Sequence, residues 1–388
     1  MKSNRSLSAN YYSSDKIWQK DKQLLKQQWQ LAGHKHFLNK TGTYRRIEVL
    51  GEDVLLWAQD DQTIKSFANI CIHHGSTLCA EQKGEAARLV CPYHSWCFDL
   101  SGNLVSTRGR LKEIENKVGL HSFHTKTSYG LHFLMLEPPS DDAHASCQEL
   151  SKYFDFYGMA NSRVIGDKSY QCSANWKLVA ENLLECYHCM PNHPQLSAAE
   201  SHIGILEQKD MDFLVDQQME YYEIAEKYDH CLPANREGIA MDVDNYALMN
   251  ACSLDRTKSS GTESGKLVAS LMGKQKVDDH GFLYGALGPL IHFAFYSDHI
   301  VIFNVQPRSV DNTEIQILWL VDDACDLNGA QVDQITWLWD TTIKQDIDLN
   351  QNVQKQMRSD YYKGGYYVDM EQHSEQFKEW YLQRLNAL

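Results

Sequence analysis

The residues of this chain that are best suited to metal chemistry lie in the stretch Asn175–Pro194, which reads NWKLVAENLLECYHCMPNHP. It contains His188 and His193, and Glu185 precedes the first of them by three residues. Neutral imidazoles bind iron, copper, nickel and zinc, and two of them leave positions for a carboxylate and for small ligands. A histidine near the C-terminal end of a helix is also favoured by the helix dipole, so the pair alone indicates either a metal site or a structural role.

A second group of metal-ligand side chains lies upstream, in the segments CIHHG and CPYHSW. The first segment supplies Cys71 and His73, and the second supplies Cys91 and His94. Two cysteines and two histidines can form a structural zinc site, but a zinc finger usually begins with a pair of cysteines rather than with Cys-x-His. One cysteine and one histidine from each loop suit a [2Fe-2S] cluster, in which two thiolates hold one iron and two imidazoles the other.

The histidine pair must be positioned by a helix and by a break in that helix. Apolar residues recur every three or four positions from Trp176 to Tyr187, which predicts a helix over Lys177–Cys189 with one buried face. Five residues along a regular helix would set His188 and His193 roughly 140° apart. The prolines after the helix therefore provide a break that both rings need in order to face one ion.

A site with two histidines and one carboxylate needs a further acidic residue. The C-terminal segment WLWDTTIKQDIDLNQNVQKQM, within a helix expected over 331–358, offers Asp340, Asp346 and Asp348. Asp348 shares its face with Gln345 and other polar residues and is expected to be solvated, while Asp340 lies near the helix start. The predicted inward stripe consists of Trp339, Ile343, Asp346, Asn350 and Val353. Asp346 is therefore the expected third ligand.

Composition and charge exclude several classes of protein. The 388 residues are 43% hydrophobic and 23% charged, which suits a globular protein of two domains. A net charge of −14 argues against a nucleic-acid partner. No apolar run approaches the ~18–20 residues of a membrane span, and residues 1–30 lack the apolar core of a signal peptide. The 11 cysteines then predict a reducing, cytoplasmic location, with thiols as ligands or core residues rather than disulfides.

The pattern of apolar residues divides the chain into a helical segment at 1–30, an all-β domain at 31–145 and a larger domain at 146–388. Strands in the all-β domain are expected at Arg46–Val49, Asp53–Trp57, Ile64–Ile70, Leu89–Val90, Trp96–Leu100 and Leu131–Leu136, with turns at 60–61, 83–84 and 99–102. Strands in the larger domain are expected at Phe213–Val215, Ile291–Ser297, His299–Gln306 and Glu314–Val321, with a further helix near 146–158 and a surface or lid loop at Ser253–Gly273.

The motifs together resemble one family. CPYHSW is similar to the C-x-YH-x-W form common in Rieske oxygenases, and the Trp96 and DLSGN turn that follow agree with it. The stretch from Asn175 resembles the family's mononuclear iron motif NWK…EN…(D/E)-x-Y-H-x4-H, and QDIDLNQNVQ is similar to its (E/Q)-D-x4-(E/Q)-x2-Q. Over roughly residues 30–385 the chain thus resembles the alpha (oxygenase) subunit of Rieske non-heme iron oxygenases.

The resemblance implies an α+β fold, in which an all-β Rieske [2Fe-2S] domain precedes a helix-grip catalytic domain made of an antiparallel sheet with helices. It implies that Cys71, His73, Cys91 and His94 hold the cluster and that His188, His193 and Asp346 bind a mononuclear iron. Glu185 stands at the family's bridging carboxylate. In the family, that carboxylate joins the iron site to a cluster histidine of a neighbouring subunit and so provides a short path for electrons. The resemblance implies that this histidine is His94 of the partner subunit, in a head-to-tail homotrimer.

The same resemblance implies the co-substrates. Relatives use O2 at the iron and receive electrons from NAD(P)H through a separate flavin or iron–sulfur reductase, and this chain has no GxGxxG or flavin motif of its own. Two segments of the chain depart from the family pattern. His74 stands where relatives usually carry Arg, and ENLLECYHC uses Glu185 and is one residue shorter than in ring-hydroxylating dioxygenases. The second departure resembles monooxygenases of quaternary ammonium compounds such as glycine betaine and carnitine.

A trimethylammonium substrate is expected to bind among aromatic side chains, here Phe282, Tyr284, Phe293, Phe295, Tyr296 and Phe303, although each could equally be a core residue. Phe293, Phe295 and Tyr296 are the named candidates, and Arg308 or His202 could bind a substrate carboxylate. The predicted function is hydroxylation or N-demethylation of such a substrate. The alternatives are the alpha subunit of an aromatic-ring dioxygenase, with a beta subunit as partner, and a non-catalytic electron-transfer or zinc-binding protein.

Overall fold

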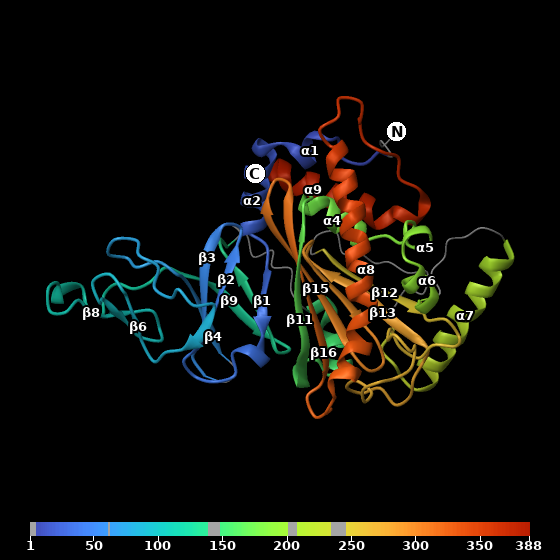
Figure 1. The fold of residues 1–388 in the computed structure, drawn as a ribbon, viewed down its shortest axis with the longest axis horizontal. Helices are drawn as coiled ribbons and strands as arrows, with labels where there is room; N and C mark the ends of the chain where they lie inside the picture. Colours follow the sequence, from blue (N-terminus) through green and yellow to red (C-terminus); the bar gives the residue numbers. More distant parts are fainter. Residues whose placement is uncertain (1–4, 61–62, 139–147, 201–207, 234–245) are drawn as a thin grey trace. The chain divides into compact units, whose positions relative to one another are not determined.

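The chain folds into two compact units (Figure 1). The computed structural model describes residues 5–60, 63–138, 148–200, 208–233 and 246–388. One unit consists of Leu25–Asp142, and the other combines Met1–Leu24 with Ala143–Leu388. The boundary expected at residues 145–146 lies outside the described residues. In the described part of the chain, no helix is long and apolar enough to cross a membrane.

The smaller unit is built from strands, as its short apolar segments predict. Seven strands form an antiparallel sheet in the order β1-β10-β9-β4-β3-β2-β5, and three form a second sheet in the order β6-β7-β8. Their bounds are β1 Gln30–His34, β2 Thr43–Val49, β3 Glu52–Ala58, β4 Ile64–Ala68, β5 Lys83–Glu85, β6 Leu89–Val90, β7 Cys97–Phe98, β8 Leu104–Ser106, β9 Ser122–Ser128 and β10 Leu131–Met135. Trp57, Phe67 and Phe98 join the two sheets in one core.

In the smaller unit, the sequence analysis missed the polar strand β9 and the short strand β5. The segment β9 reads SFHTKTS and is partly exposed along its length, so it lacks an apolar stripe although it pairs with β10 and β4. The predicted turn at residues 83–84 is wrong, because Lys83 and Gly84 lie in β5. Gly84 serves there as a small residue, since a Cβ would meet the Tyr44 hydroxyl at 2.6 Å. Backbone pairing places these residues in the sheet, and their side chains carry no signal of it.

A six-stranded antiparallel sheet forms the centre of the larger unit, with the order β11-β16-β15-β14-β13-β12. The strands are β11 Ser162–Cys172, β12 Ala247–Ser253, β13 Gly281–Leu287, β14 Ile291–Phe295, β15 Ile300–Ser309 and β16 Asn312–Asp322. The helices are α1 Asn10–Ser13, α2 Asp15–Lys26, α3 Gln148–Phe156, α4 Trp176–Leu183, α5 Cys189–Asn192, α6 Pro194–Ala199, α7 Gln208–Lys227, α8 Gly329–Gln356 and α9 Gln372–Ala387. An all-β unit and a sheet with helices confirm the expected α+β class.

The long helix α8 crosses one face of the sheet and packs against α4 and β11 (Figure 1). Its start is fixed by a capping box between Asn328 and Gln331, and it corresponds to the helix predicted over 331–358. The first four members of the predicted stripe, from Trp339 to Asn350, are buried. The prediction for the last member was wrong, because Val353 is 43% exposed. The next residue, Gln354, is buried and donates to the Tyr12 carbonyl at 3.2 Å.

Two other expectations for the larger unit need correction. Phe213–Val215 lies within α7 rather than in a strand, because a short apolar run does not distinguish a strand from one turn of a helix. The Ser253–Gly273 loop has no regular structure beyond its first residue, as predicted, yet Ser260 and Met272 in it are fully buried. Asp298 ties this loop to the sheet, since it accepts hydrogen bonds from the Ser260 hydroxyl at 2.5 Å and the Val268 amide at 2.8 Å.

The N-terminal helix α2 is fixed to α4 and α9 by a buried carboxylate. Asp21 is fully buried and forms an ion pair with Lys177, which is fully buried as well. The Tyr381 hydroxyl donates to Asp21 at 2.6 Å, and the Trp176 indole donates at 3.2 Å. A buried charge is tolerated only when it is paired and hydrogen-bonded, and these three donors meet that condition. Residues before position 25 therefore belong structurally to the unit that contains α4 and α9.

Candidate functional site

The helix that leads to the metal-ligand histidines is shorter than predicted. It ends at Leu183 rather than Cys189. Glu185 Oε2 accepts hydrogen bonds from the backbone amides of Tyr187 and His188, at 2.5 and 3.3 Å. The carboxylate thus takes donors that a continuing helix would use, so the chain leaves the helix at this point. Tyr187, expected on the buried face, is 56% exposed.

His188 is held through both ring nitrogens. Its Nδ1 lies 2.5 Å from Glu185 Oε1 and donates to that carboxylate, while Nε2 accepts from the Asn182 amide at 3.0 Å. The same Nε2 lies 3.2 Å from Asp346 Oδ1. In the neutral tautomer that the Glu185 contact favours, Nε2 and Oδ1 are both electron-pair donors. Two such atoms face one another stably only with a proton or a cation between them.

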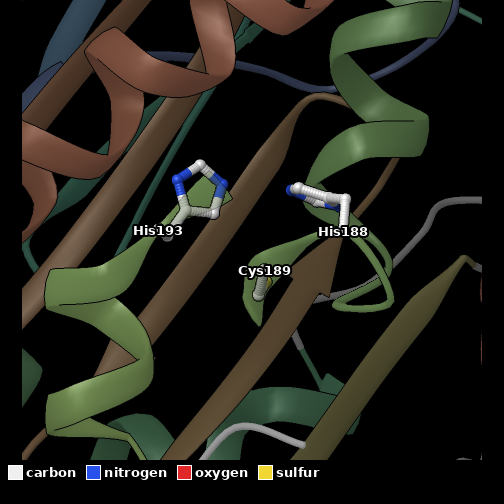
Figure 2. A group of neighbouring side chains, drawn as sticks. All are labelled: His188, Cys189 and His193. Atoms are coloured by element: carbon white, nitrogen blue, oxygen red, sulfur yellow. The ribbon is translucent and has the colours of Figure 1, made fainter. Parts of the chain in front are cut away.

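His193 lies beyond the break in the helix and approaches the same carboxylate, that of Asp346. Its ring is fully buried, and Nδ1 donates to Gln345 Oε1 at 2.8 Å. His193 Nε2 lies 2.9 Å from Asp346 Oδ1, without the geometry of a hydrogen bond. Figure 2 shows the rings of His188 and His193 beside one another, with their centroids 5.2 Å apart and their planes 80° apart. The structure thus brings the three predicted ligands of the second site together.

The arrangement fits a divalent metal ion bound by two imidazoles and one carboxylate, with positions left for other ligands. The outer nitrogen of each ring is already fixed, by Glu185 for one and by Gln345 for the other, which sets the tautomer and orientation of both. Burial lowers the pKa of His188, but hydrogen bonds with Asp346 and Glu185 outweigh burial and raise the pKa to about 9. A metal ion that binds here takes the place of the proton between His188 Nε2 and Asp346.

Cys189, the first residue of α5, lies within the same group of potential ligand atoms as the two histidines, as Figure 2 shows. Its sulfur is not a thiolate, because it forms a disulfide with Cys186. The expectation that the cysteines form no disulfides was therefore wrong, since a tight loop brings two thiols three positions apart together. The disulfide closes a small ring that contains His188.

The acidic residues of α8 are buried or exposed as expected, but the neighbouring Gln345 is not solvated as expected. Asp346 is 4% exposed, Asp348 is exposed, and Asp340 binds the Tyr170 hydroxyl at 2.5 Å, away from the histidines. Burial raises the pKa of Asp346, but His188 and the second imidazole hold the pKa below its ordinary value. Gln345, expected to be solvated, is half-buried against the second histidine. Its position beside Asp346 was the only sequence signal for that role.

The four residues expected to hold the cluster lie on two loops of the smaller unit that repeat one backbone conformation. The Gly75 amide donates to the Cys71 carbonyl at 2.9 Å, and the Ser95 amide donates to the Cys91 carbonyl at 2.9 Å. Gly75 and Ser95 occupy equivalent positions and both have positive φ, +74° and +58°. A left-handed residue costs glycine little and costs serine more, so both loops are held in shape by what they bind or pack against.

The donor set of these loops fits a [2Fe-2S] cluster. His73 and His94 have ring centroids 4.7 Å apart, and His73 stacks on Trp96 at 4.3 Å. The Nδ1 atom of His73 is buried and has no hydrogen-bond partner, as expected for a ligand atom. Burial raises the pKa of the Cys91 thiol, but backbone amides of His94 and its neighbour outweigh burial and lower it. Such amides stabilise a thiolate.

A cavity of about 390 Å³ adjoins the histidine pair in the larger unit. Its walls come from the loop and helices after α4, from β12 and β13, from α8 and from the start of α9. The described lining residues are Asn182, Leu183, Leu184, Glu185, Cys186, His188, Cys189, His193, Leu196, Glu200, Leu248, Asn250, Cys252, Phe282, Tyr284, Trp339, Thr342, Asp346, Met370 and His373. Its exposed surface is mostly apolar, so the cavity suits a small, largely apolar ligand.

The sheet register decides which aromatic residues face this cavity. Tyr284 pairs with Ala294, while Phe293 and Phe295 pair with Gly285 and Leu283, so the two phenylalanines point to the opposite face. There they pack against Phe154 of α3, at 5.2 and 6.1 Å between ring centroids. Tyr296 is fully buried and is also absent from the lining. The structure thus brings Phe282 and Tyr284 to the cavity and leaves the three named candidates, Phe293, Phe295 and Tyr296, outside its wall.

Of the two residues expected to bind a substrate carboxylate, the structure describes only Arg308. Arg308 pairs with Glu314 at 3.0 Å and does not line the cavity. His202 lies outside the described residues.

Comparisons with known proteins identify both units. A family model described as the catalytic domain of the ring hydroxylating alpha subunit matches residues 159–387, and a Rieske [2Fe-2S] domain model matches residues 28–118. The glycine betaine monooxygenase oxygenase subunit of Pseudomonas aeruginosa (strain PAO1) is 30% identical over 392 residues, which cover 98% of this chain and 89% of that protein. The carnitine monooxygenase oxygenase subunit of Escherichia coli K12 is 26% identical over 196 residues, 49% of this chain and 52% of that protein.

Solved structures resemble the fold of the whole chain. The quaternary ammonium Rieske monooxygenase CntA in complex with L-carnitine superposes with a TM-score of 0.71 at 16% identity, covering 98% of this chain and 95% of that one. Naphthalene 1,2-dioxygenase from Rhodococcus sp. bound to indole superposes with a TM-score of 0.69 at 15% identity, covering 98% and 94%. The likeness confirms the expected order of an all-β Rieske domain followed by a catalytic domain of antiparallel strands and helices.

Proposed function

The chain belongs to the family of ring-hydroxylating oxygenase alpha subunits with a Rieske [2Fe-2S] domain, and on this premise we propose that it oxidises a small quaternary ammonium compound. Members of this family are oxidoreductases that contain a [2Fe-2S] cluster and a mononuclear iron. Similarity over nearly the full length to a glycine betaine monooxygenase subunit supports the substrate class. The observation that carries the proposal is the aromatic cavity beside the histidine pair, where Phe282, Tyr284 and Trp339 can contact a trimethylammonium group.

We assign the ligands as the sequence suggested. Cys71, His73, Cys91 and His94 hold the cluster, and His188, His193 and Asp346 bind the iron. When bound, the iron provides the place where O2 reacts with the substrate, and the cluster supplies electrons to it. The protein side chains fix the geometry: Glu185 and Gln345 hold the outer N–H groups of the two imidazoles, so both inner nitrogens face the cavity.

The reaction inserts one oxygen atom of O2 into a C–H bond of an N-methyl group. Two electrons from NAD(P)H and two protons reduce the other oxygen atom to water. The hydroxymethyl product then breaks its C–N bond, with loss of a proton, to give formaldehyde and the tertiary amine that keeps the other two methyl groups. Because no nicotinamide or flavin motif occurs in this chain, a separate reductase supplies the electrons.

A homotrimer would deliver those electrons between subunits. Glu185 and His188 line a second groove of about 340 Å³, which Tyr362 and Tyr366 also line. In the smaller unit, Tyr93 beside the cluster histidine His94 is 66% exposed. We propose that the cluster loops of a partner subunit occupy this groove, so that Glu185 accepts a hydrogen bond from His94 of the partner subunit.

The experiment that tests the function is a formaldehyde-release screen with a surrogate reductase and NADH. Glycine betaine, carnitine, choline and aromatic acids are supplied in turn, and O2 and NADH consumption are followed with the product. Formaldehyde formed in proportion to NADH from a quaternary ammonium compound is the expected result. Cis-diol formation from an aromatic compound, without formaldehyde, would support an aromatic-ring dioxygenase instead.

A further inference from the structure

A third carboxylate faces the substrate cavity from a different part of the chain. Glu185 and Asp346 both contact His188, whereas Glu200, directly after α6, accepts a hydrogen bond from the Tyr296 hydroxyl. Glu200 is 2% exposed and lines the cavity together with the aromatic side chains of β13 and α8. A buried carboxylate in an aromatic wall creates a negative potential, and low-dielectric walls strengthen it.

Glu200 is held in place by a hydrogen-bonded relay from α8. The Tyr296 hydroxyl donates to Glu200 Oε1, and the Trp339 indole donates to the same hydroxyl at 2.9 Å. Tyr296 is itself fixed between Phe282, stacked at 5.3 Å, and His299, stacked at 4.6 Å. A donor that is fully buried and packed against two rings keeps the carboxylate at one place in the wall.

The rest of the described lining also favours a cation. It contains no lysine or arginine. Asn250 Oδ1 is buried without a hydrogen-bond partner, while the Asn250 amide lies 3.2 Å from His373 Nε2. Burial lowers the pKa of His373, which keeps this ring neutral. The wall thus offers negative charge, aromatic faces and an acceptor oxygen, all of which attract a positively charged head group.

We propose that Glu200 is the specificity-determining residue that selects a cationic substrate, with Tyr296 and Trp339 as the residues that position it. This inference rests on the proposed function and deepens it, because it names the charge that distinguishes a quaternary ammonium compound from a neutral molecule of the same shape. The Glu200 carboxylate attracts the positive nitrogen, while Phe282 and Tyr284 contact its methyl groups. Tyr296, expected from the sequence to touch the substrate, acts through Glu200 instead.

The test compares two pairs of ligands that differ in charge and not in shape. Choline is paired with 3,3-dimethylbutan-1-ol, and glycine betaine with 3,3-dimethylbutanoate, in which carbon replaces the quaternary nitrogen. Their dissociation constants are measured on the holoenzyme without O2, so that no turnover occurs. We expect the wild-type protein to bind whichever of the two cations binds more tightly better than its uncharged-carbon isostere. Glu200→Gln should reduce this ratio of dissociation constants by about 30-fold or more, because it weakens binding of the cation and not of the isostere.

Control variants separate charge from folding. Glu200→Asp keeps the charge and should retain most of the preference, and Tyr296→Phe should reduce it less than Glu200→Gln does. Glu223→Gln removes the same charge from an exposed position and should leave the preference unchanged. Unchanged cluster absorbance and iron content show that each variant is folded and loaded.

Two results would overturn the inference. One is a Glu200→Gln variant that keeps the wild-type preference, and the other is a wild-type protein that binds the isosteres as tightly as the cations. Failure of the proposed function looks different. In that case the preference exists and depends on Glu200, yet no quaternary ammonium compound yields formaldehyde.

Discussion

The two metal-binding regions of this protein are constructed in contrasting ways. In the smaller unit, the four proposed cluster ligands all lie between Cys71 and His94, and two backbone turns with matching hydrogen bonds present them. In the larger unit, His188 and Asp346 are 158 residues apart, and side chains from separate segments hold them. The first site is encoded locally, and the second exists only when the whole unit has folded. Substitutions should therefore affect the two sites independently.

The largest effect is expected from Asp346→Ala. This variant removes the one carboxylate that both imidazoles approach, so turnover should fall below detection, while the cluster of the smaller unit stays intact. Iron and sulfide analysis should change from about three irons and two sulfides per chain to about two of each. Asp348→Ala is the matched control on the exposed side of α8 and should behave as wild type. A protein that contains zinc and no visible colour would contradict both assignments.

A strong effect on stability is expected from Asp21→Ala. It leaves Lys177 as a buried charge without its carboxylate, which should cost about 3–5 kcal/mol of unfolding free energy. Because Asp21 binds α4 and α9, the loss should appear in the unfolding of the larger unit. The visible absorbance of the cluster should persist to higher denaturant concentration than the far-ultraviolet helix signal. Simultaneous loss of both signals would show that the two regions unfold together.

A smaller effect separates the two outer partners of the histidines. Glu185→Gln should keep both metal centres and lower reductase-supported turnover by about 10- to 100-fold, because the carboxylate of the proposed bridge is lost. Gln345→Ala removes the hydrogen-bond partner of His193. Neither of these two residues lines the second groove, so this variant should mainly weaken iron retention. Equal turnover of Glu185→Gln and wild type would exclude the bridging role. Equal iron loss in both variants would show that Glu185 only orients the imidazole of His188.

The smallest effect concerns pH and Glu181 in α4. Burial raises the pKa of this carboxyl to about 7, although the Tyr12 hydroxyl donates to it at 2.9 Å and opposes the rise. The folded state therefore keeps a proton that the unfolded state releases near its ordinary pKa. Since the unfolded state then binds fewer protons, stability should fall as pH rises from about 4.5 to about 7 and stay level above that.

Melting temperatures of wild type and Glu181→Gln at about pH 5 and about pH 8 measure this effect. The variant has no proton to lose, so its melting temperature should fall less across that interval than that of the wild type. The cluster absorbance should show no such difference, because Glu181 lies in the other unit. A larger pH dependence in the variant would show that the carboxyl is ionised in the folded protein.

The contrast between the regions also explains what the sequence could predict. Cys71, His73, Cys91 and His94 could be proposed from the sequence because their residue types and spacing place them in two short, similar segments. Asp346 was readable because a helical period placed it on the inward face of α8. The end of α4 was not readable, because it depends on which backbone amides the Glu185 carboxylate accepts from.

The substrate wall was hidden for a different reason. A β-strand with apolar residues on both faces does not reveal which face meets the cavity, so the sequence analysis chose Phe293 over Tyr284, and only the register corrects that choice. Glu200 carried no signal at all, because its role depends on Tyr296 and Trp339, distant in sequence. Side-chain networks that join remote segments are the part of a site that periodicity cannot express.

The position of the smaller unit within the chain has a consequence for biosynthesis. Residues 25–142 interrupt the larger unit, which starts before them and resumes after them. A ribosome releases α2 early, yet Tyr381, which binds Asp21, is made 360 residues later. The cluster loops, by contrast, can fold as soon as residue 142 has emerged, because every strand that supports them has then been synthesised. Cluster loading can thus begin on the nascent chain, whereas the iron site must wait for the release of α8.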